Sequence, residues 1–493
     1  MATTEQQTDR TGNIPALTGL RAVAACWVML LHLQTISGPY LEQLPLVRPL
    51  IGAGWTGVEL FFVLSGFVLT LGYLDRIGAR PTAPVIGRFL VNRFARVWPA
   101  WAVVTLIGGA WLWTIRSAGW DADVISPHPE AGLTSLVRQL SMTQMWGYSE
   151  LGGASFVPPG WSISAEWTAY LVLPLAMVLV RPLRRLPAGL LMAAAVAAMS
   201  PLAVDAFVHG TPDSEQNWVL RIVCGFTAGV FSALAHRRVA RTERTDSIGL
   251  AMVWSALLLV LAGVSWASWA AWQQGPGAAV DHYGVIVVLF PVLVVGLALT
   301  ARGPARWLAS APMVYGGKVS YCLYLVHFLV LDVALTIWWQ EPADRDMITP
   351  GLVLTVPGLV IVALVASVAL HHGVEEPGRK LVLRLQERLV PARRSEQPAA
   401  TARPASVVAL PTPVAAVPVP LPRGAAGLGG LTGAPGTGSQ PDGRSRLDRP
   451  ARPLQTAVQV ALPALVPTAS VRSAAGRHVR PAGWTRETVS TSH

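Results

Sequence analysis

Ten apolar segments recur along the chain, and each is about as long as a membrane-spanning helix. Because the bilayer interior offers no hydrogen-bonding partners, such segments form helices that satisfy their own backbone groups. Hydrophobic residues make up 52% of the sequence and charged residues only 13%. We therefore predict an all-α polytopic membrane protein of about ten transmembrane helices, near residues 17–37, 53–74, 97–115, 162–180, 186–207, 217–235, 247–272, 282–300, 314–339 and 351–371.

The arginines are distributed unevenly between the two sets of connecting loops. An even number of spans puts both termini on one side of the membrane, and the loops on that side are the arginine-rich ones. Positively charged loops stay in the cytoplasm, so we predict that both termini are cytoplasmic and that the chain lies in the cytoplasmic (inner) membrane. By the same rule we expect Arg241 to be cytoplasmic, and Asp213 and Asp344 to be external.

The net charge of +11 does not indicate a nucleic-acid partner, because the basic residues cluster in short loops and no DNA-binding motif is present. The three cysteines, Cys26, Cys224 and Cys322, fall in separate spans, which gives neither a disulfide framework nor a metal-ligand spacing. We therefore expect no metal and no permanently bound cofactor. The apolar spans predict that the protein is embedded in a lipid bilayer.

Composition divides the chain into four parts. Residues 1–13 form a short polar terminus, and residues 14–380 hold all the apolar spans. The longest external loop, residues 116–160, could cap an external entrance or serve as a plain connector. Residues 381–395 combine leucines at helical spacing with basic side chains, which is typical of a helix on the cytoplasmic leaflet. Residues 396–493 are rich in Ala, Pro, Gly and Arg without periodicity, and we expect a disordered cytoplasmic tail.

Two ionisable residues lie inside the first apolar run. Arg21 and His32 are eleven positions apart, so they share one helix face and stand about 16 Å apart along its axis. Ionisable groups inside a membrane are costly and commonly face a cavity or a partner. Arg21 could instead extend its charge to the lipid headgroups, and His32 could be a packing residue.

Two acidic residues lie at a similar depth to His32 when each is counted from the external end of its span. Glu59 is about six residues into the second span and Glu166 about five into the fourth. A carboxylate beside a histidine can fix its tautomer and keep it basic, so we predict a shared polar site at this level. The alternative is that these acids only neutralise buried cations or mark helix starts. Ser65, in the same run as Glu59, is a further candidate for the lining of the site.

Arginines and aromatic residues mark two other spans. Arg93 and Arg96 enter the third span at its cytoplasmic end, where guanidinium groups suit phosphate binding, although loop-charge bias alone would also explain them. In the ninth span, Tyr321, Tyr324 and His327 recur at intervals of three residues and form one polar stripe. A buried histidine in such a stripe needs a hydrogen-bonding partner, whereas the tyrosines alone could be ordinary packing.

Six motifs, in this order, resemble those of acyltransferase family 3, and the resemblance covers residues 14 to about 380. They are Arg21-x10-His32, the GVELFFVLSGF run, Arg93-x-x-Arg96-Val-x-Pro99, WSISAEW-x-x-Tyr170-Leu-x-x-Pro174, the SYCLYLVH run and Glu376-Pro377.

The resemblance implies a multi-pass enzyme that transfers acyl groups, usually acetyl from acetyl-CoA, to hydroxyls of glycans or secondary metabolites. It also implies that Arg21 and His32 are tied to activity and that Arg93 and Arg96 help to hold acyl-CoA. This chain departs from the family pattern in having Glu59 where Asp is usual. It also has Glu166-Trp167 where paired acids are common, and it lacks the hydrolase-like external domain of some relatives.

These observations together predict a membrane-bound O-acyltransferase in which acyl-CoA is a co-substrate and a glycan or small molecule is the acceptor. We expect His32 and Glu166 to be catalytic, with His32 as general base and Glu166 or Glu59 orienting it, and Arg21, Arg93 and Arg96 to bind the donor. Glu59, Ser65, Tyr324 and His327 are the expected lining residues. A transporter or flippase could use the same buried charges as a substrate path, although no inverted repeat is evident. A noncatalytic membrane scaffold would leave the buried polar residues unexplained.

Overall fold

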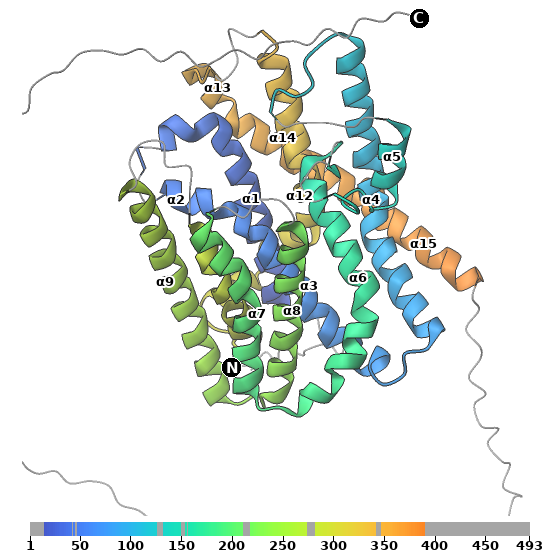
Figure 1. The fold of residues 1–493 in the computed structure, drawn as a ribbon, viewed down its shortest axis with the longest axis vertical. Helices are drawn as coiled ribbons and strands as arrows, with labels where there is room; N and C mark the ends of the chain where they lie inside the picture. The colour runs from blue at the N-terminus through green and yellow to red at the C-terminus, as the bar shows by residue number, and fades with distance from the viewer. Residues whose placement is uncertain are drawn as a thin grey trace, which may run out of the picture. The chain divides into compact units, whose positions relative to one another are not determined.

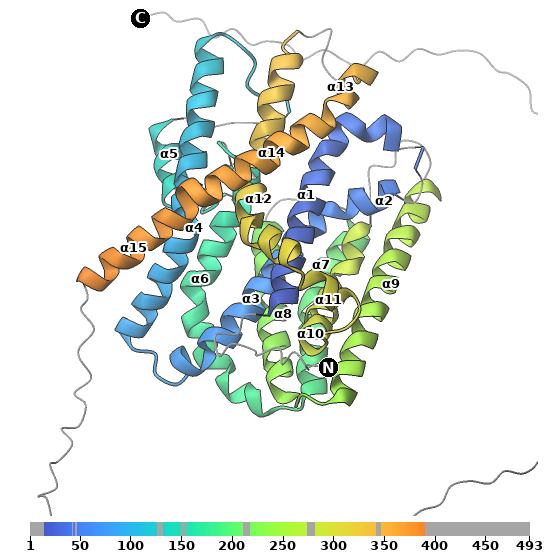
Figure 2. The ribbon, with the colours of Figure 1, turned by 180° about the vertical axis from the view of Figure 1, so that it is seen from behind.

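The computed structural model describes residues 14–389 apart from 42, 45–46, 126–131, 149–152, 155, 211–216, 274–281 and 342–346. The polar terminus 1–13, residues 390–395 of the predicted interfacial helix and the tail 396–493 lie outside the described residues, as do Asp213 and Asp344. The described residues form helices joined by turns and loops, which confirms the prediction of an all-α polytopic membrane protein. Figure 1 shows these helices as a bundle, and Figure 2 shows them from behind.

The helices follow one another along the chain with short 3₁₀ or π turns (η) between some of them. They are α1 (Pro15–Leu41), α2 (Val47–Gly52), η1 (Ala53–Thr56), α3 (Gly57–Ile77), α4 (Ala83–Ser117), α5 (Leu133–Leu140), η3 (Pro158–Gly160), α6 (Trp161–Val180), η4 (Arg181–Arg185), α7 (Ala188–Val208), α8 (Asn217–Arg238), α9 (Glu243–Gln273), η5 (Tyr283–Leu289), α10 (Phe290–Leu299), α11 (Pro304–Leu308), α12 (Ala311–Trp338), α13 (Pro350–Leu354), α14 (Val356–Leu370), η6 (His371–Glu375) and α15 (Glu376–Leu389).

Nine segments within the described residues are long and apolar enough to cross a membrane, and each corresponds to a predicted span. The predicted span 282–300 instead corresponds to a shorter apolar helix, Tyr283–Leu299. Its first part, η5, is a 3₁₀ helix, which rises about 2.0 Å per residue against about 1.5 Å in an α-helix. The two parts together therefore extend roughly 29 Å, close to the thickness of a bilayer core, and the expected number of about ten spans is retained.

The centre of the bundle is built on close helix pairs. Figures 1 and 2 both show α1, α3, α8 and α12 in the middle, between α7 and α9 on one side and α4, α5 and α6 on the other. A Cβ atom added at Gly66 of α3 would lie 2.3 Å from the carbonyl oxygen of Phe226 on α8, and one at Gly317 of α12 would lie 1.8 Å from that of Thr18 on α1. Glycine at these two positions lets the backbones approach, and this fixes α12 against the helix that carries His32.

Helix α4 begins well before the predicted third span. It starts at Ala83, with Pro84 in its first turn, and runs for 35 residues. Arg93 and Arg96 therefore lie inside a helix and are partly buried, rather than at its cytoplasmic start as expected. Pro99, in the middle of α4, packs against Gly378, where an added Cβ would meet the proline ring carbon at 2.6 Å.

The end of the described chain also differs from the prediction. A separate interfacial helix was expected from residue 381, but α14 continues through the π-helical turn η6 into α15 without a break. Pro377 has no backbone N–H, so the regular i→i−4 hydrogen-bond ladder cannot pass through it unchanged. The π turn precedes this proline and changes the register of the ladder there. Helix α15 then packs against α4.

The long loop between α4 and α6 enters the bundle. Gln139 and Gln144 are buried, and their side-chain nitrogens donate to the carbonyls of Gly153 at 3.0 Å and Gly160 at 2.8 Å. These bonds hold the segment that leads into α6, and the first residues of α6 are themselves buried. Helix α6 therefore begins inside the protein and not at its surface.

Candidate active site

A small cavity lies between α1, α3, α6 and α12. Its volume is about 40 Å³, which is room for a few water molecules but not for a sugar. Polar and aromatic side chains that are far apart in the sequence meet around it. The lining residues are Arg21, Val58, Phe61, Phe62, Ser65, Ser162, Ile163, Glu166, Tyr321 and Tyr324.

Glu166 lies in this cavity together with Arg21. The Ser65 hydroxyl donates to Glu166 Oε1 at 2.6 Å, and the Tyr170 hydroxyl donates to the same oxygen at 2.5 Å. Among the residues that the structure describes, Glu166 makes no hydrogen bond to His32. In this arrangement Glu166 does not contact His32, and its catalytic role stays a prediction. Glu166 is the sixth residue of α6, and α6 begins among buried residues, so a count from the membrane surface does not give its place in the bundle.

The three predicted donor-binding arginines each lie against an aromatic ring. The guanidinium carbon of Arg21 is 5.5 Å from the centre of the Phe61 ring. That of Arg93 is 5.8 Å from the Tyr73 ring, and its buried Nε has no hydrogen-bond partner in the described part of the chain. Within the same residues neither Arg21 nor Arg93 has a carboxylate partner. Both can therefore accept an anionic ligand without losing an ion pair.

Arg96 is different, because it already has a partner. It forms an ion pair with Glu375, a residue of the π turn that is 1% exposed. The second oxygen of Glu375 accepts hydrogen bonds from the Cys322 thiol at 3.1 Å and from His371 Nδ1 at 2.7 Å. Glu376, the acid of the Glu376-Pro377 motif, is one position later and is half exposed.

Cys322, His371 and Glu375 also bring three potential metal-ligand atoms within 4.8 Å of one another. Their present hydrogen bonds, together with the charge of Arg96 on Glu375, already satisfy the carboxylate. A divalent cation would have to displace two protons beside a permanent positive charge, which makes this cluster a poor metal site.

Glu59 forms a buried ion pair with Arg221 of α8, which is not among the predicted site residues. Its Oε1 accepts from Arg221 Nε at 2.5 Å, and the side chains are 0% and 5% exposed. The guanidinium of Arg221 also lies over the rings of Trp161, at 4.3 Å, and Trp55, at 5.4 Å. This is the alternative interpretation of Glu59, an acid that neutralises a buried cation. An arginine near the start of the apolar span 217–235 was the signal that could have revealed it.

His32 contacts His327 across the pair α1 and α12. His327 Nε2 lies 3.2 Å from His32 Nδ1, and the ring centres are 5.1 Å apart. His327 is 4% exposed, and the Phe328 ring stands edge-on to His32 at 5.1 Å. The histidine of the ninth span therefore has its expected hydrogen-bonding partner, and that partner is the histidine of the first.

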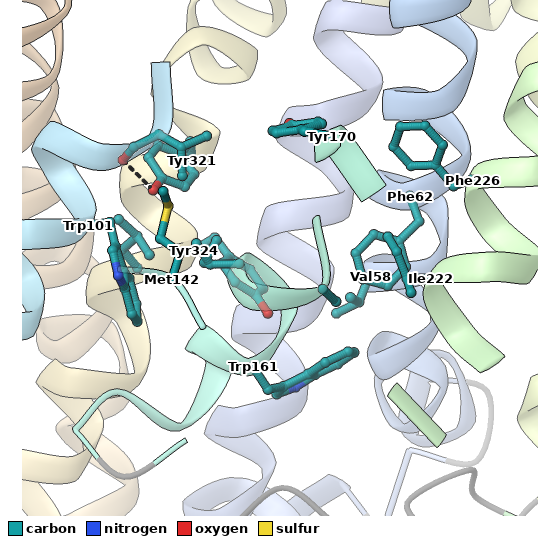
Figure 3. Packing of buried hydrophobic residues seen from close by; sticks show 14 of the residues in the cluster. Val58, Phe62, Trp101, Met142, Trp161, Tyr170, Ile222, Phe226, Tyr321 and Tyr324 are labelled. Carbon is teal, nitrogen blue, oxygen red and sulfur yellow. Dashed lines mark hydrogen bonds between the residues drawn. The ribbon is translucent and has the colours of Figure 1, made fainter. Parts of the chain in front are cut away.

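Tyr324 connects the cavity to the two histidines. It lines the cavity, its hydroxyl lies 2.8 Å from Ser162 Oγ, and its ring centre is 5.8 Å from that of His327. Tyr321, one turn earlier, donates to the backbone carbonyl of Val97 at 2.8 Å, the bond drawn in Figure 3. The polar stripe of α12 thus runs from the cavity to His32.

The sequence of this chain is similar to those of known proteins. Residues 14–372 match the acyltransferase domain family. The chain is 28% identical over 394 residues to the acyltransferase MdmB of Streptomyces mycarofaciens, covering 76% of this chain and 93% of that protein. It is 25% identical over 345 residues to nodulation protein 10 of Rhizobium leguminosarum bv. viciae, covering 65% of this chain and 83% of that one. No solved structure matches.

A third relative is longer than the matched region. A protein of Staphylococcus aureus strain COL is 23% identical over 380 residues, covering 68% of this chain and 57% of that protein. It is named an O-acetyltransferase, with that activity marked in the name as not yet proven.

Proposed function

The chain belongs to the acyltransferase domain family, and on this premise we propose that it transfers an acyl group, in the simplest case acetyl, from acyl-CoA to a hydroxyl of a carbohydrate or secondary metabolite. As a multi-pass membrane acyltransferase it needs an acyl donor and an acceptor. We place it in the cytoplasmic membrane, with the arginine-rich side facing the acyl-CoA of the cytoplasm.

The observation that carries this proposal is a row of polar side chains along α1 and α12. Arg21 shares a cavity with Tyr324, Tyr324 adjoins His327, and His327 contacts His32. The row covers the roughly 16 Å of α1 between Arg21 and His32, a length comparable to the pantetheine arm of CoA. A phosphate held near Arg21 and Arg93 would thus place a thioester within reach of His32.

In this proposal the transfer is direct. His32 takes the proton of the acceptor hydroxyl, and the oxygen attacks the thioester carbonyl. The C–S bond of the resulting tetrahedral species breaks, and the CoA thiolate leaves and takes up the proton. Binding the donor requires the bundle to open around the cavity, because about 40 Å³ holds only a few water molecules. The arm and acceptor would then be oriented before reaction, which lowers the entropic part of the barrier.

The transporter alternative has less support. Both functions account for buried charges, but the family shared with acyltransferases favours group transfer. The contact between two histidines on neighbouring helices suits proton transfer to and from a reacting hydroxyl.

The test combines chemistry in vitro with a product in cells. Purified protein in lipid nanodiscs is given acetyl-labelled acetyl-CoA and an extract of envelope glycans and metabolites, and transfer of the label is followed by mass spectrometry. The acceptor is identified by comparing the same fractions from a deletion strain and its parent. We expect a labelled ester that is missing in the deletion strain and restored by the parental gene but not by His32→Ala. Restoration by a stably inserted His32→Ala protein would contradict the proposal.

A further inference from the structure

We propose that His327 is a positioning residue for His32, holding it in the tautomer that has its proton on Nδ1 and its basic lone pair on Nε2. This inference rests on the proposed function only in taking His32 as the general base. The tautomer itself follows from hydrogen-bond geometry.

The first step concerns His327 alone. Its Nδ1 lies 3.0 Å from the backbone carbonyl oxygen of Leu323, one turn earlier in α12. A carbonyl oxygen can only accept, so Nδ1 of His327 must carry a hydrogen. In a neutral imidazole the other ring nitrogen is then an acceptor. His327 therefore presents an acceptor, Nε2, to α1.

The second step concerns His32. Its Nδ1 lies 2.9 Å from the carbonyl oxygen of Val28 and 3.2 Å from His327 Nε2. Both of these neighbours are acceptors. One hydrogen on His32 Nδ1, shared between them, satisfies both contacts, and the lone pair of a neutral His32 is then on Nε2.

The other protonation states fit poorly. With its hydrogen on Nε2, His32 would point the Nδ1 lone pair at two further lone pairs at 2.9 and 3.2 Å. If His327 instead carried two hydrogens, it could donate to His32, but the Nδ1 lone pair of His32 would still face the Val28 carbonyl. That state would also bury a charge on a residue that is 4% exposed.

Packing keeps the two rings in this arrangement. Phe328 stands edge-on to His32 at an interplanar angle of 87°, and Tyr324 lies beside His327. The helices that carry the histidines approach closely at Gly317, which leaves little freedom to slide. Rotating the His32 ring would therefore disturb several contacts at once.

The arrangement has a consequence for catalysis. When Nε2 of His32 takes the proton of a hydroxyl, the ring becomes an imidazolium that still donates from Nδ1 to Val28 and His327. Hydrogen bonds from a charged donor are stronger than those from a neutral one. His327 thus stabilises the charged intermediate form of the base without touching the substrate.

The direct test is nitrogen NMR of histidine-labelled protein in nanodiscs. The His32 signals are assigned as those missing from His32→Gln. We expect a hydrogen-bearing Nδ1 and a lone-pair Nε2, with the Nδ1 signal shifted in His327→Phe, which keeps an aromatic ring but removes the acceptor. A hydrogen on Nε2 of His32 in the parental protein would overturn the inference.

Kinetics then separate positioning from packing. His327→Phe should lower the single-turnover rate roughly ten- to a hundredfold, the range found when a residue that orients a metal-bound histidine is lost, with acyl-CoA affinity unchanged. His327→Gln should recover most of the rate, because its amide oxygen can take the place of Nε2 as acceptor. The matched control is His209→Gln, on an exposed histidine just after α7 that pairs with Asp205, and it should retain the parental rate.

The outcomes are distinguishable. A His327→Phe protein with the parental rate, or a His327→Gln protein as slow as His327→Phe at equal thermal stability, would overturn the positioning role. A parental protein with the expected His32 tautomer but no acyl transfer would contradict the proposed function and leave the hydrogen-bond assignment in place.

Discussion

Arg96 of α4 is ion-paired with Glu375 in the π turn between α14 and α15. This pair joins a helix expected to hold the donor to the last described helical segment of the chain. It also means that Arg96 differs from Arg21 and Arg93, because a donor phosphate would have to share or replace a carboxylate there.

The first prediction is that Glu375 contributes to stability. Glu375→Gln leaves Arg96 without its counter-charge, and breaking a buried pair by removing one partner commonly costs about 3–5 kcal/mol. Arg96 is 26% exposed, so solvent screening lowers the expected loss to about 2 kcal/mol. Denaturation of purified protein in detergent measures this. The control is Glu376→Gln, one position later and 47% exposed. An equal loss in the two variants would contradict the prediction.

The second prediction concerns the buried pair between Glu59 and Arg221. Glu59→Gln removes the carboxylate that pairs with Arg221, a cation that is 5% exposed, and we expect a loss of about 3–5 kcal/mol. Replacing both residues with apolar ones, Glu59→Leu with Arg221→Met, should recover much of it, because neither member of this pair then has to be buried as an ion.

The control for this pair is Asp75→Asn. Asp75 is 58% exposed and pairs with Arg237, so the expected change is below about 1 kcal/mol. If the double variant were less stable than Glu59→Gln alone, the pair would have a role beyond charge neutralisation.

The third prediction separates Arg21 from His32. Arg21→Lys keeps the positive charge but loses the bidentate hydrogen bonding of a guanidinium group. It should therefore weaken acyl-CoA binding, while some turnover survives at saturating acyl-CoA. His32→Ala should leave donor binding nearly intact and lower the rate of transfer about a hundredfold or more. Acyl-CoA affinity and single-turnover rates on folded variants measure both, with Arg76→Lys at the exposed end of α3 as the control. A His32→Gln protein with the parental rate would remove the catalytic assignment.

The fourth prediction is the orientation in the membrane. Cysteine at position 241 should be cytoplasmic and cysteine at position 141 external, because of the loop-charge bias. Both positions are exposed, whereas Cys224 and Cys322 are buried and contribute little background. An impermeant thiol reagent on intact cells should label Ser141→Cys and not Arg241→Cys, and the opposite pattern would reverse the orientation.

The sequence predicted the fold class and most of the spans because a bilayer imposes a simple one-dimensional rule. A segment of about 20 apolar residues must become a helix wherever it crosses, whatever its neighbours are. The same rule made Arg21 and His32 conspicuous, since their spacing fixes a shared helix face. The motifs of α4, α6 and α12 drew attention to residues that the structure does bring near one another, including Tyr324 and His327.

No such rule says which polar side chains contact one another across neighbouring helices. Only the tertiary structure decided these contacts. Counting residues from a membrane surface assumes that each helix starts there, but α6 starts inside the protein, so Glu166 joins Ser65 and Arg21 and not His32. Likewise Glu59 pairs with Arg221, Arg96 with Glu375, and His32 with His327. Each pair joins residues far apart in the chain, and its partners are set by where helix backbones can approach, as at Gly66 and Gly317. The sequence alone determined which polar residues are buried in the membrane, and the packing of the helices determined which of them meet.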